Sequence, residues 1–184
     1  YQAMDIPGVA SVHPLYSNNL IWKNPQTRRE ATIQVIGLSV DRPAFRLPEV
    51  NRQLNRIKLP DVVLFDRGSR GDYKQTIAQV AAGKIITTEA EGRTIRIGGL
   101  FTLGASFGTD GILMTSDQNF LRLFPKRDVG SISLGLIDVK PGHNPLQIAN
   151  TLKSHLPNDV KVMTLAEFIE DEQAYWRKES PIGF

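Results

Sequence analysis

The order of strand-like and helix-like segments after Gly111 is the feature that most constrains how this chain can fold. Residues 131–139 alternate apolar with small or polar side chains, which is typical of a half-buried strand. Asn144 and Pro145 form an N-cap and first-turn pair that predicts a helix ending at Pro157. The predicted apolar positions are Ile132, Leu134 and Leu136 in the strand and Ile148, Ala149, Leu152 and Leu156 in the helix. Because these segments follow one another without a long βαβα run, an α+β fold is favoured.

The rest of the chain adds short strands and two further helices. Residues 93–101 should form a hairpin with the preceding strand across a Gly-containing loop at 90–92. Ser116 is the expected N-cap of a short helix, and Thr164 with Glu167 forms a capping box that opens the last helix. Other strands are expected at 9–16, 31–40, 61–65, 84–88, 112–114 and 160–163. The predicted apolar face of the last helix consists of Leu165, Phe168, Ile169, Tyr175 and Trp176.

A change of composition between Pro43 and Gly111 predicts how the chain is organised into subdomains. Prolines punctuate this stretch, and charged residues alternate there with short apolar patches. We therefore expect an outer subdomain formed by residues 1–42 and 112–184. A smaller, β-rich subdomain formed by residues 43–111 would be inserted between its two halves.

Length, charge and cysteine content exclude several classes of protein. The chain has 184 residues, which is enough for one domain or for one domain with a sizeable insertion. Its net charge of +3 does not require a polyanionic partner, and its basic clusters lack interleaved aromatic residues, so we expect no nucleic acid among its partners. The absence of cysteine excludes disulfides, thiolate zinc sites and cysteine nucleophiles.

The two ends of the sequence suggest a fragment attached to a membrane. No apolar run reaches the roughly 18 residues that span a bilayer, and the first residue is Tyr rather than Met, so we expect a piece of a longer chain. Near the C-terminal end an aromatic pair precedes two cations, an order that membrane–water interfaces favour. The expected membrane-proximal residues are Tyr175, Trp176, Arg177, Lys178 and Pro181. An amphipathic C-terminal helix with a frayed tail is the alternative interpretation.

One pattern associated with catalysis is G-x-S-x-G at residues 104–108, with Ser106 as the candidate nucleophile. A nucleophile elbow requires a helix directly after the serine, whereas Thr109 and Asp110 lead into another strand-like run. A Gly-rich loop is therefore favoured over a serine hydrolase. No Gly-Lys-Ser/Thr follows these glycines and the three histidines are isolated from one another, so we expect neither a cofactor nor a metal.

Several stretches of the sequence together carry a resemblance to a known family. The more specific ones are 63–70, the Gly-Leu-Phe run within 98–111, 116–121 and the tail at 175–184, and the looser ones are 6–14, 36–41 and 139–142. Taken together they resemble the extracytoplasmic domain of ABC transporter permeases of the MacB/FtsX type. The resemblance covers about residues 6–184 and is closest to the DevC branch, the permeases of cyanobacterial glycolipid exporters.

The resemblance implies a non-catalytic, soluble domain on the periplasmic side of the inner membrane, with a porter-like outer subdomain. It implies a permease homodimer, that is, a second permease copy, served by a separate cytoplasmic ATPase subunit. It also implies a periplasmic membrane-fusion (adaptor) protein, a TolC-type outer-membrane channel, and a lipid or glycolipid cargo. ATP-driven movement of the membrane helices would reposition such domains and drive the cargo into the channel.

Contacts with the adaptor or cargo are expected in the Gly- and charge-rich loops of the inserted segment, since such loops can vary without disturbing a core. The candidate contact residues are Arg67, Ser69, Arg70, Tyr73, Leu103, Ser106, Phe107 and Asp110. An extracytoplasmic sensor or interaction domain between two membrane helices is the alternative from another class. A serine hydrolase that uses Ser106 is the third hypothesis.

Overall fold

The structure of the chain is a computed structural model that describes residues 2–42, 47–103, 109–167 and 170. It contains two compact units. The central unit comprises His13–Leu136, and the terminal unit combines Tyr1–Val12 with Ile137–Phe184. The predicted inserted subdomain at 43–111 stays a prediction. Several residues singled out from the sequence lie outside the described part, namely Ser106, Phe107, Phe168, Ile169, Tyr175, Trp176, Arg177, Lys178 and Pro181.

The strands form one mixed sheet that is closed by an additional strand pairing. The strands are β1 (Val9–Lys23), β2 (Glu30–Leu38), β3 (Val62–Asp66), β4 (Ile86–Ala90), β5 (Arg93–Phe101), β6 (Ile112–Ser116) and β7 (Leu134–Val139). Their order is β2-β6-β3-β5-β4-β1-β7, and β1 also pairs with β2. The β2–β6 and β3–β5 pairs are parallel, whereas β1–β2, β3–β6 and β4–β5 are antiparallel. This mixed sheet with its helices confirms the predicted α+β class.

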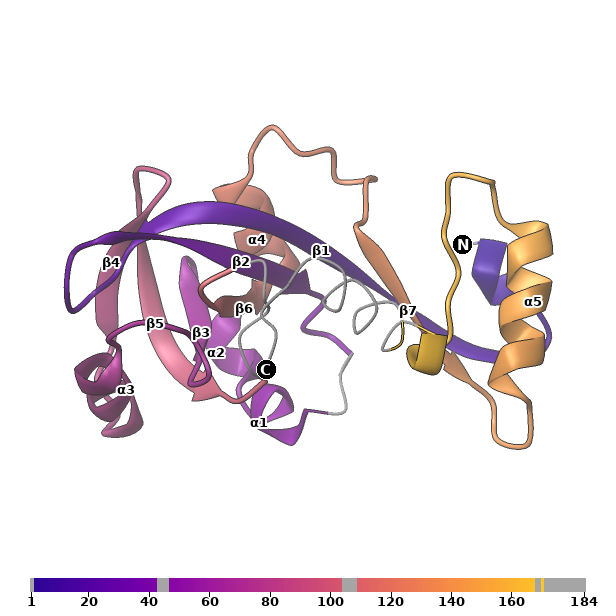
Figure 1. The fold of residues 1–184 in the computed structure, drawn as a ribbon, viewed down its shortest axis with the longest axis horizontal. Coiled ribbons are helices and arrows are strands. Elements are labelled where there is room, and N and C mark those ends of the chain that lie inside the picture. The colour runs from indigo at the N-terminus through magenta and orange to yellow at the C-terminus, as the bar shows by residue number, and fades with distance from the viewer. Residues whose placement is uncertain (1, 43–46, 104–108, 168–169, 171–184) are drawn as a thin grey trace, which may run out of the picture. The chain divides into compact units, whose positions relative to one another are not determined.

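The described part of the central unit also contains four helices, three of which were not expected from the sequence. They are α1 (Pro48–Asn51), α2 (Leu54–Ile57), α3 (Lys74–Ala81) and α4 (Asp117–Leu123). The first two have four residues each, and α3 buries only Thr76 and Val80, so none of the three carries an apolar stripe long enough to be recognised. Figure 1 shows α3 at the end of the β4–β5 pair opposite its hairpin turn.

Strand β3 lies at the centre of the core because both of its faces are buried. Its five residues are all buried, and successive side chains point to opposite faces of the sheet. Phe65 packs with Trp22 and Tyr73, whose ring centroids lie 5.4 and 4.8 Å from its own. On the other face, Leu64 belongs to a cluster with Val50 of α1 and Ile57 of α2. The short helices therefore cover one face of the sheet beside β3.

Two local predictions in the central unit are confirmed. The β4–β5 hairpin pairs Ala90 with Arg93, which leaves Glu91 and Gly92 as a two-residue turn. Their φ angles of 48° and 72° are those of a type I′ turn, in which glycine at the second position avoids a steric penalty. Ser116 caps α4, since its hydroxyl accepts a hydrogen bond from the Asn119 backbone nitrogen at 3.1 Å.

Two strand predictions are wrong in part or in whole. Strand β7 begins only at Leu134, and Ile132 and Leu134 are 47% and 48% exposed instead of buried. Polar contacts hold the preceding segment, since the Tyr16 hydroxyl donates to the Val129 carbonyl at 2.6 Å and Arg127 donates to Ser133 Oγ at 2.7 Å. Residues 160–163 form no strand; a turn hydrogen bond joins the amide of Val160 to the carbonyl of Pro157.

The terminal unit is built around α5 (Pro145–His155), which packs against the 3₁₀ turn at Gln2–Asp5 and the residues after it. The Asn144 side chain caps α5 by accepting from the Leu146 amide at 2.9 Å, as predicted. Gly8 has a φ of 93°, and a Cβ there would lie 2.6 Å from Ile148 Cδ1, so only glycine fits. The buried apolar residues of this unit are Ala3, Ile6, Val9, Ile148, Ala149 and Leu152.

The capping box at the next helix is also confirmed. Glu167 accepts from the Thr164 amide at 2.7 Å, and the Glu167 amide donates to Thr164 Oγ1 at 3.1 Å. Leu165, predicted on the buried face of this helix, is 75% exposed. Across the described residues, no helix combines the length and the apolar character needed to cross a bilayer.

Candidate docking surface and its arginine-lined groove

Asp66 joins two loops that are far apart in the sequence. It ends β3, is fully buried, and accepts through Oδ1 from the amides of Gly68 at 2.9 Å and Leu103 at 3.0 Å. Strands β3 and β5 run parallel with Asp66 opposite Phe101, so their carboxyl ends meet at one edge of the sheet. The loop that follows Asp66 and the loop that follows Phe101 therefore share an anchor.

The backbone of the first loop completes this arrangement. The Arg67 amide donates to the Phe101 carbonyl at 2.9 Å, and the Arg70 amide donates to the Asp110 carbonyl at 2.6 Å. The hydroxyl of Ser69 is buried and has no hydrogen-bond partner among the described residues. These contacts bring five of the predicted contact residues to one edge, which we call the docking edge: Arg67, Ser69, Arg70, Leu103 and Asp110.

Tyr73, a sixth predicted contact residue, lies in the core and not on the docking edge. Its side chain is 2% exposed and packs on Trp22 and Phe65. Burial raises the pKa of its hydroxyl above the usual value of 10.0. The Tyr73 ring therefore supports the loop from within the core. Leu103, in contrast, is 49% exposed on the docking edge. Ser106 and Phe107 belong to the part of the loop outside the described residues.

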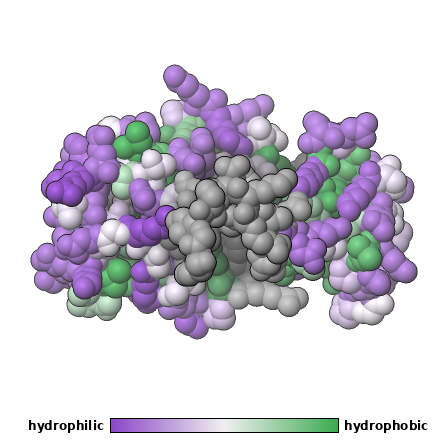
Figure 2. Space-filling view, viewed as in Figure 1, coloured by the Kyte–Doolittle hydropathy of each residue, from purple (hydrophilic) through white to green (hydrophobic). Residues whose placement is uncertain are grey.

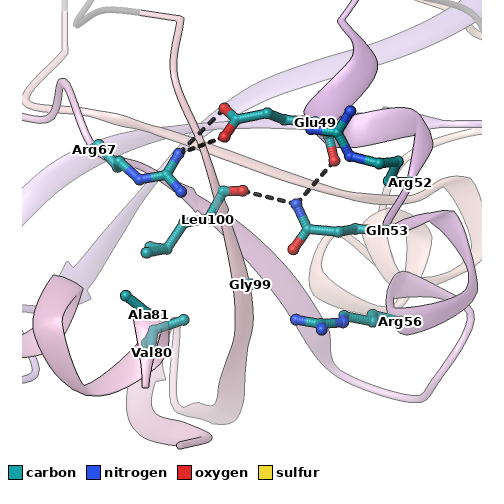
Figure 3. A pocket seen from close by; sticks show the side chains of 9 residues that line it. All are labelled: Glu49, Arg52, Gln53, Arg56, Arg67, Val80, Ala81, Gly99 and Leu100. Atoms are coloured by element: carbon teal, nitrogen blue, oxygen red, sulfur yellow. Dashed lines mark hydrogen bonds and ion pairs between the residues drawn. The ribbon is translucent and has the colours of Figure 1, made fainter. Parts of the chain in front are cut away.

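A groove of about 310 Å³ opens next to the docking edge (Figure 3). The helical segment at 48–57 forms one wall, the end of α3 contributes a second, and the backbone of β5 at Gly99 and Leu100 contributes a third. Three guanidinium groups and one carboxylate line it, so the side chains carry a net charge of +2. The lining residues with polar side chains are Glu49, Arg52, Gln53, Arg56 and Arg67.

Hydrogen bonds hold the walls of the groove together. Arg67 Nη1 donates to both carboxylate oxygens of Glu49, at 3.0 and 3.1 Å, and to Thr102 Oγ1 at 3.2 Å. Gln53 Nε2 donates to the carbonyls of Glu49 at 2.9 Å and Leu100 at 2.7 Å, which ties the helical wall to β5. A Cβ at Gly99 would collide with the Gln53 side chain, so glycine is needed for this close approach.

The sequence interpretation missed the helical wall of this groove. Residues 49, 52, 53 and 56 have the i, i+3, i+4, i+7 spacing that places side chains on one face of a helix. This spacing can be read from the sequence, but the four side chains are polar, so they do not form the apolar stripe by which an amphipathic helix is recognised. For the same reason the sequence does not predict the short helices α1 and α2.

Hydrophilic side chains dominate the part of the central unit visible in Figure 2, and the hydrophobic residues there appear as separate spots. The large apolar side chains of the central unit that are exposed include Ile21, Leu59, Ile85, Leu103 and Val129. Among the residues that the structure describes, no group of His, Asp or Glu side chains is arranged to hold a metal ion.

Comparison with known proteins shows that this chain is similar in structure to solved domains of other proteins. No family model matches the sequence, and no curated protein resembles it. The extracellular domain of the noncanonic ABC-type transporter YknZ from Gram-positive bacteria is similar with a TM-score of 0.54 and 12% identity, over 88% of this chain and 85% of that one. The periplasmic region of MacB from Actinobacillus actinomycetemcomitans is similar with a TM-score of 0.52 and 15% identity, over 96% and 79%. This chain therefore has the fold of the extracytoplasmic domains of the ABC transporters YknZ and MacB.

Proposed function

We propose that this chain is the extracytoplasmic domain of an ABC exporter permease, on the periplasmic side of the inner membrane. In this role it catalyses no reaction; it transmits ATP-driven motion of the membrane helices and docks a membrane-fusion protein. The observation that carries the proposal is the likeness in fold to YknZ and MacB, which extends over 88% and 96% of the chain. The interfacial composition of residues 175–184 supports attachment to a membrane.

The finer parts of the proposal depend on the sequence resemblance. These are the DevC branch, a lipid or glycolipid cargo, a TolC-type channel, a separate ATPase subunit and a second permease copy. The rigid core around β3 supports a mechanical role, because a close-packed interior transmits strain. The docking edge supports adaptor binding, because its loops are anchored by Asp66 while Arg67 and Arg70 remain at the surface.

Charge reversal on the docking edge tests this proposal. The double substitution Arg67→Glu with Arg70→Glu should weaken binding of the membrane-fusion protein of the same transporter by tenfold or more, as measured by biolayer interferometry, and should reduce export. The matched control, Arg93→Glu with Lys126→Glu, reverses two charges at exposed positions; Arg93 opens β5 eight residues before Phe101, and Lys126 follows α4 at the opposite end of β3 from Asp66. Unchanged adaptor binding and export in the first variant, with both variants folded by circular dichroism, would remove the proposed docking role.

The hydrolase alternative has its own test. Incubation of the domain with a fluorophosphonate probe should give no labelling if residues 104–108 serve only as a Gly-rich loop, because a serine hydroxyl is labelled only when a base activates it. Labelling that disappears in a Ser106→Ala variant would contradict a non-catalytic role.

A further inference from the structure

We propose that the groove between residues 49–56 and β5 is a binding site for a phosphate group. The argument concerns the guanidinium groups of Arg52 and Arg56 and does not depend on the transport function proposed above. Phosphate is the chemical class favoured by several guanidinium groups in one recess, because each presents a planar fork of donors to its oxygens.

The donors in the groove exceed the acceptors that the protein provides. A guanidinium group has five N–H donors. Within the described part of the chain, the Arg52 guanidinium group has no hydrogen-bond or ion-pair partner, and the Arg56 guanidinium group donates only through Nη1, to the Gly98 carbonyl at 2.9 Å. Arg67 uses one nitrogen, Nη1, for Glu49 and Thr102. The remaining guanidinium nitrogens are available to a ligand.

The placement of the two arginines is unfavourable without a ligand. Arg52 is the C-cap of α1 and Arg56 lies in α2, so the two cations line the same recess from neighbouring short helices, where like charges repel each other. Gln53 lies between them in the sequence, and its hydrogen bond to the Leu100 carbonyl fastens this segment to β5. Figure 3 shows both arginines beside the Gln53 side chain, on the wall that faces β5. An anion bound in this recess would offset their repulsion.

Among the described residues, Glu49 is the one carboxylate that lines the groove, and Arg67 donates to both of its oxygens. The side chains of Glu49 and Arg67 are 39% and 37% exposed, so solvent screens this ion pair and it contributes little to stability. A phosphate group could therefore displace Glu49 from Arg67 at small cost. It follows that removing the Glu49 charge should strengthen phosphate binding instead of weakening it.

The test uses this chain with two probes, inorganic phosphate and vesicles. Phosphate is titrated at low ionic strength while the Nε–H signals of arginine are followed by NMR. The vesicles are phosphatidylcholine alone or phosphatidylcholine with phosphatidylglycerol, and binding is measured by co-sedimentation. Saturable shifts of Arg52 and Arg56 with phosphate are expected. Binding of phosphatidylglycerol vesicles in addition assigns the site to lipid headgroups, whereas phosphate binding without vesicle binding assigns it to a soluble phosphate compound.

The variants separate a site from general charge attraction. Arg52→Gln with Arg56→Gln should weaken binding tenfold or more, and Glu49→Gln should strengthen it by roughly two- to fivefold. The control, Arg29→Gln with Arg93→Gln, removes the same charge; Arg93 lies six residues before Gly99 on β5, about 20 Å away. The absence of saturable binding to both probes, or an equal loss in the control, would overturn the proposal. Because Arg52 and Arg56 are exposed, their double variant should unfold at the same denaturant concentration as the parent.

Discussion

At the scale of single residues, the central unit depends on a few side chains that meet several partners at once. Asn119 is the clearest case. It is buried, and its Nδ2 donates to the carbonyls of Ile57 and Leu59, both at 2.9 Å, while its Oδ1 accepts from the Asp61 amide at 3.1 Å. Asp61 has a φ of 60°, which is unusual for a residue other than glycine. Asn119 thus holds the turn that leads into β3.

We predict that Asn119→Asp lowers the free energy of unfolding by roughly 2–4 kcal/mol, because a carboxylate cannot donate to the buried carbonyls. Denaturant unfolding followed by circular dichroism measures this. Asn18→Ala, at an exposed position, is the control and should change stability by less than about 0.5 kcal/mol. Equal stability of the two variants would show that Asn119 does not hold the turn.

Gly37 is a second such residue, because β2 passes close to α4 there. A Cβ at Gly37 would lie 2.5 Å from Phe120 Cβ and 2.8 Å from Phe120 Cγ, and Phe120 is fully buried. Gly37→Ala should therefore destabilise the protein by roughly 1–3 kcal/mol through overpacking. At Gly130 the nearest atom to an added Cβ is 3.5 Å away, so Gly130→Ala should be close to neutral in the same unfolding experiment. A neutral Gly37→Ala would mean that α4 can move away from β2.

At the scale of elements, the helix that begins at Leu165 depends on a charged cap. The hydrogen bond from the Thr164 amide, together with the nearby Lys153 ammonium, lowers the pKa of Glu167 below its usual value of 4.5. A carboxyl group with a lowered pKa stabilises the folded state above the unfolded pKa. This contribution is lost as the pH falls below 4.5 and through the folded pKa.

We expect an NMR titration of the Glu167 carboxyl carbon to show a midpoint below 4.5. Lys153→Gln should raise this midpoint but leave it below 4.5, since the backbone hydrogen bond from Thr164 makes the larger contribution to the lowered pKa. A midpoint at or above 4.5 in the unmodified chain would show that the cap does not form in solution.

Elements with a strong local signal could be predicted from the sequence. The caps at Ser116 and Asn144 and the hairpin turn at Glu91 and Gly92 depend on neighbouring residues only, and each is confirmed. The strand predicted at 160–163 failed because a strand forms only beside a partner, and these residues pair with no strand in the described part of the chain.

The candidate site could be predicted only in part. The sequence shows that its loops are rich in Gly and in charged residues. The two loops meet at Asp66 because β3 and β5 pair in parallel, and the predicted β4–β5 hairpin does not indicate that pairing. Tyr73 looked like a loop residue, whereas the aromatic contacts with Trp22 and Phe65 bury it. The arginine groove requires the β5 backbone as a wall, and this depends on the tertiary structure.

At the scale of the whole molecule, the proposed location can be tested with cysteine chemistry, because the chain has no cysteine of its own. Gln118→Cys introduces one thiol at an exposed position of the central unit. In the complete parent polypeptide, with any other cysteines replaced, a membrane-impermeant maleimide should label it in cells whose outer membrane alone has been made permeable. Labelling that requires lysis of the inner membrane would place the domain in the cytoplasm and contradict the proposal.

We propose that this domain moves when ATP is bound and hydrolysed elsewhere in the transporter. The most direct measurement is pulsed electron paramagnetic resonance between spin labels at Asn150→Cys, an exposed position of α5, in the two copies of the complete permease reconstituted with its ATPase. The proposed role predicts that trapping ATP shifts the distance distribution between the labels by several ångströms. An identical distribution with and without trapped ATP, in a preparation that exports its cargo, would contradict it.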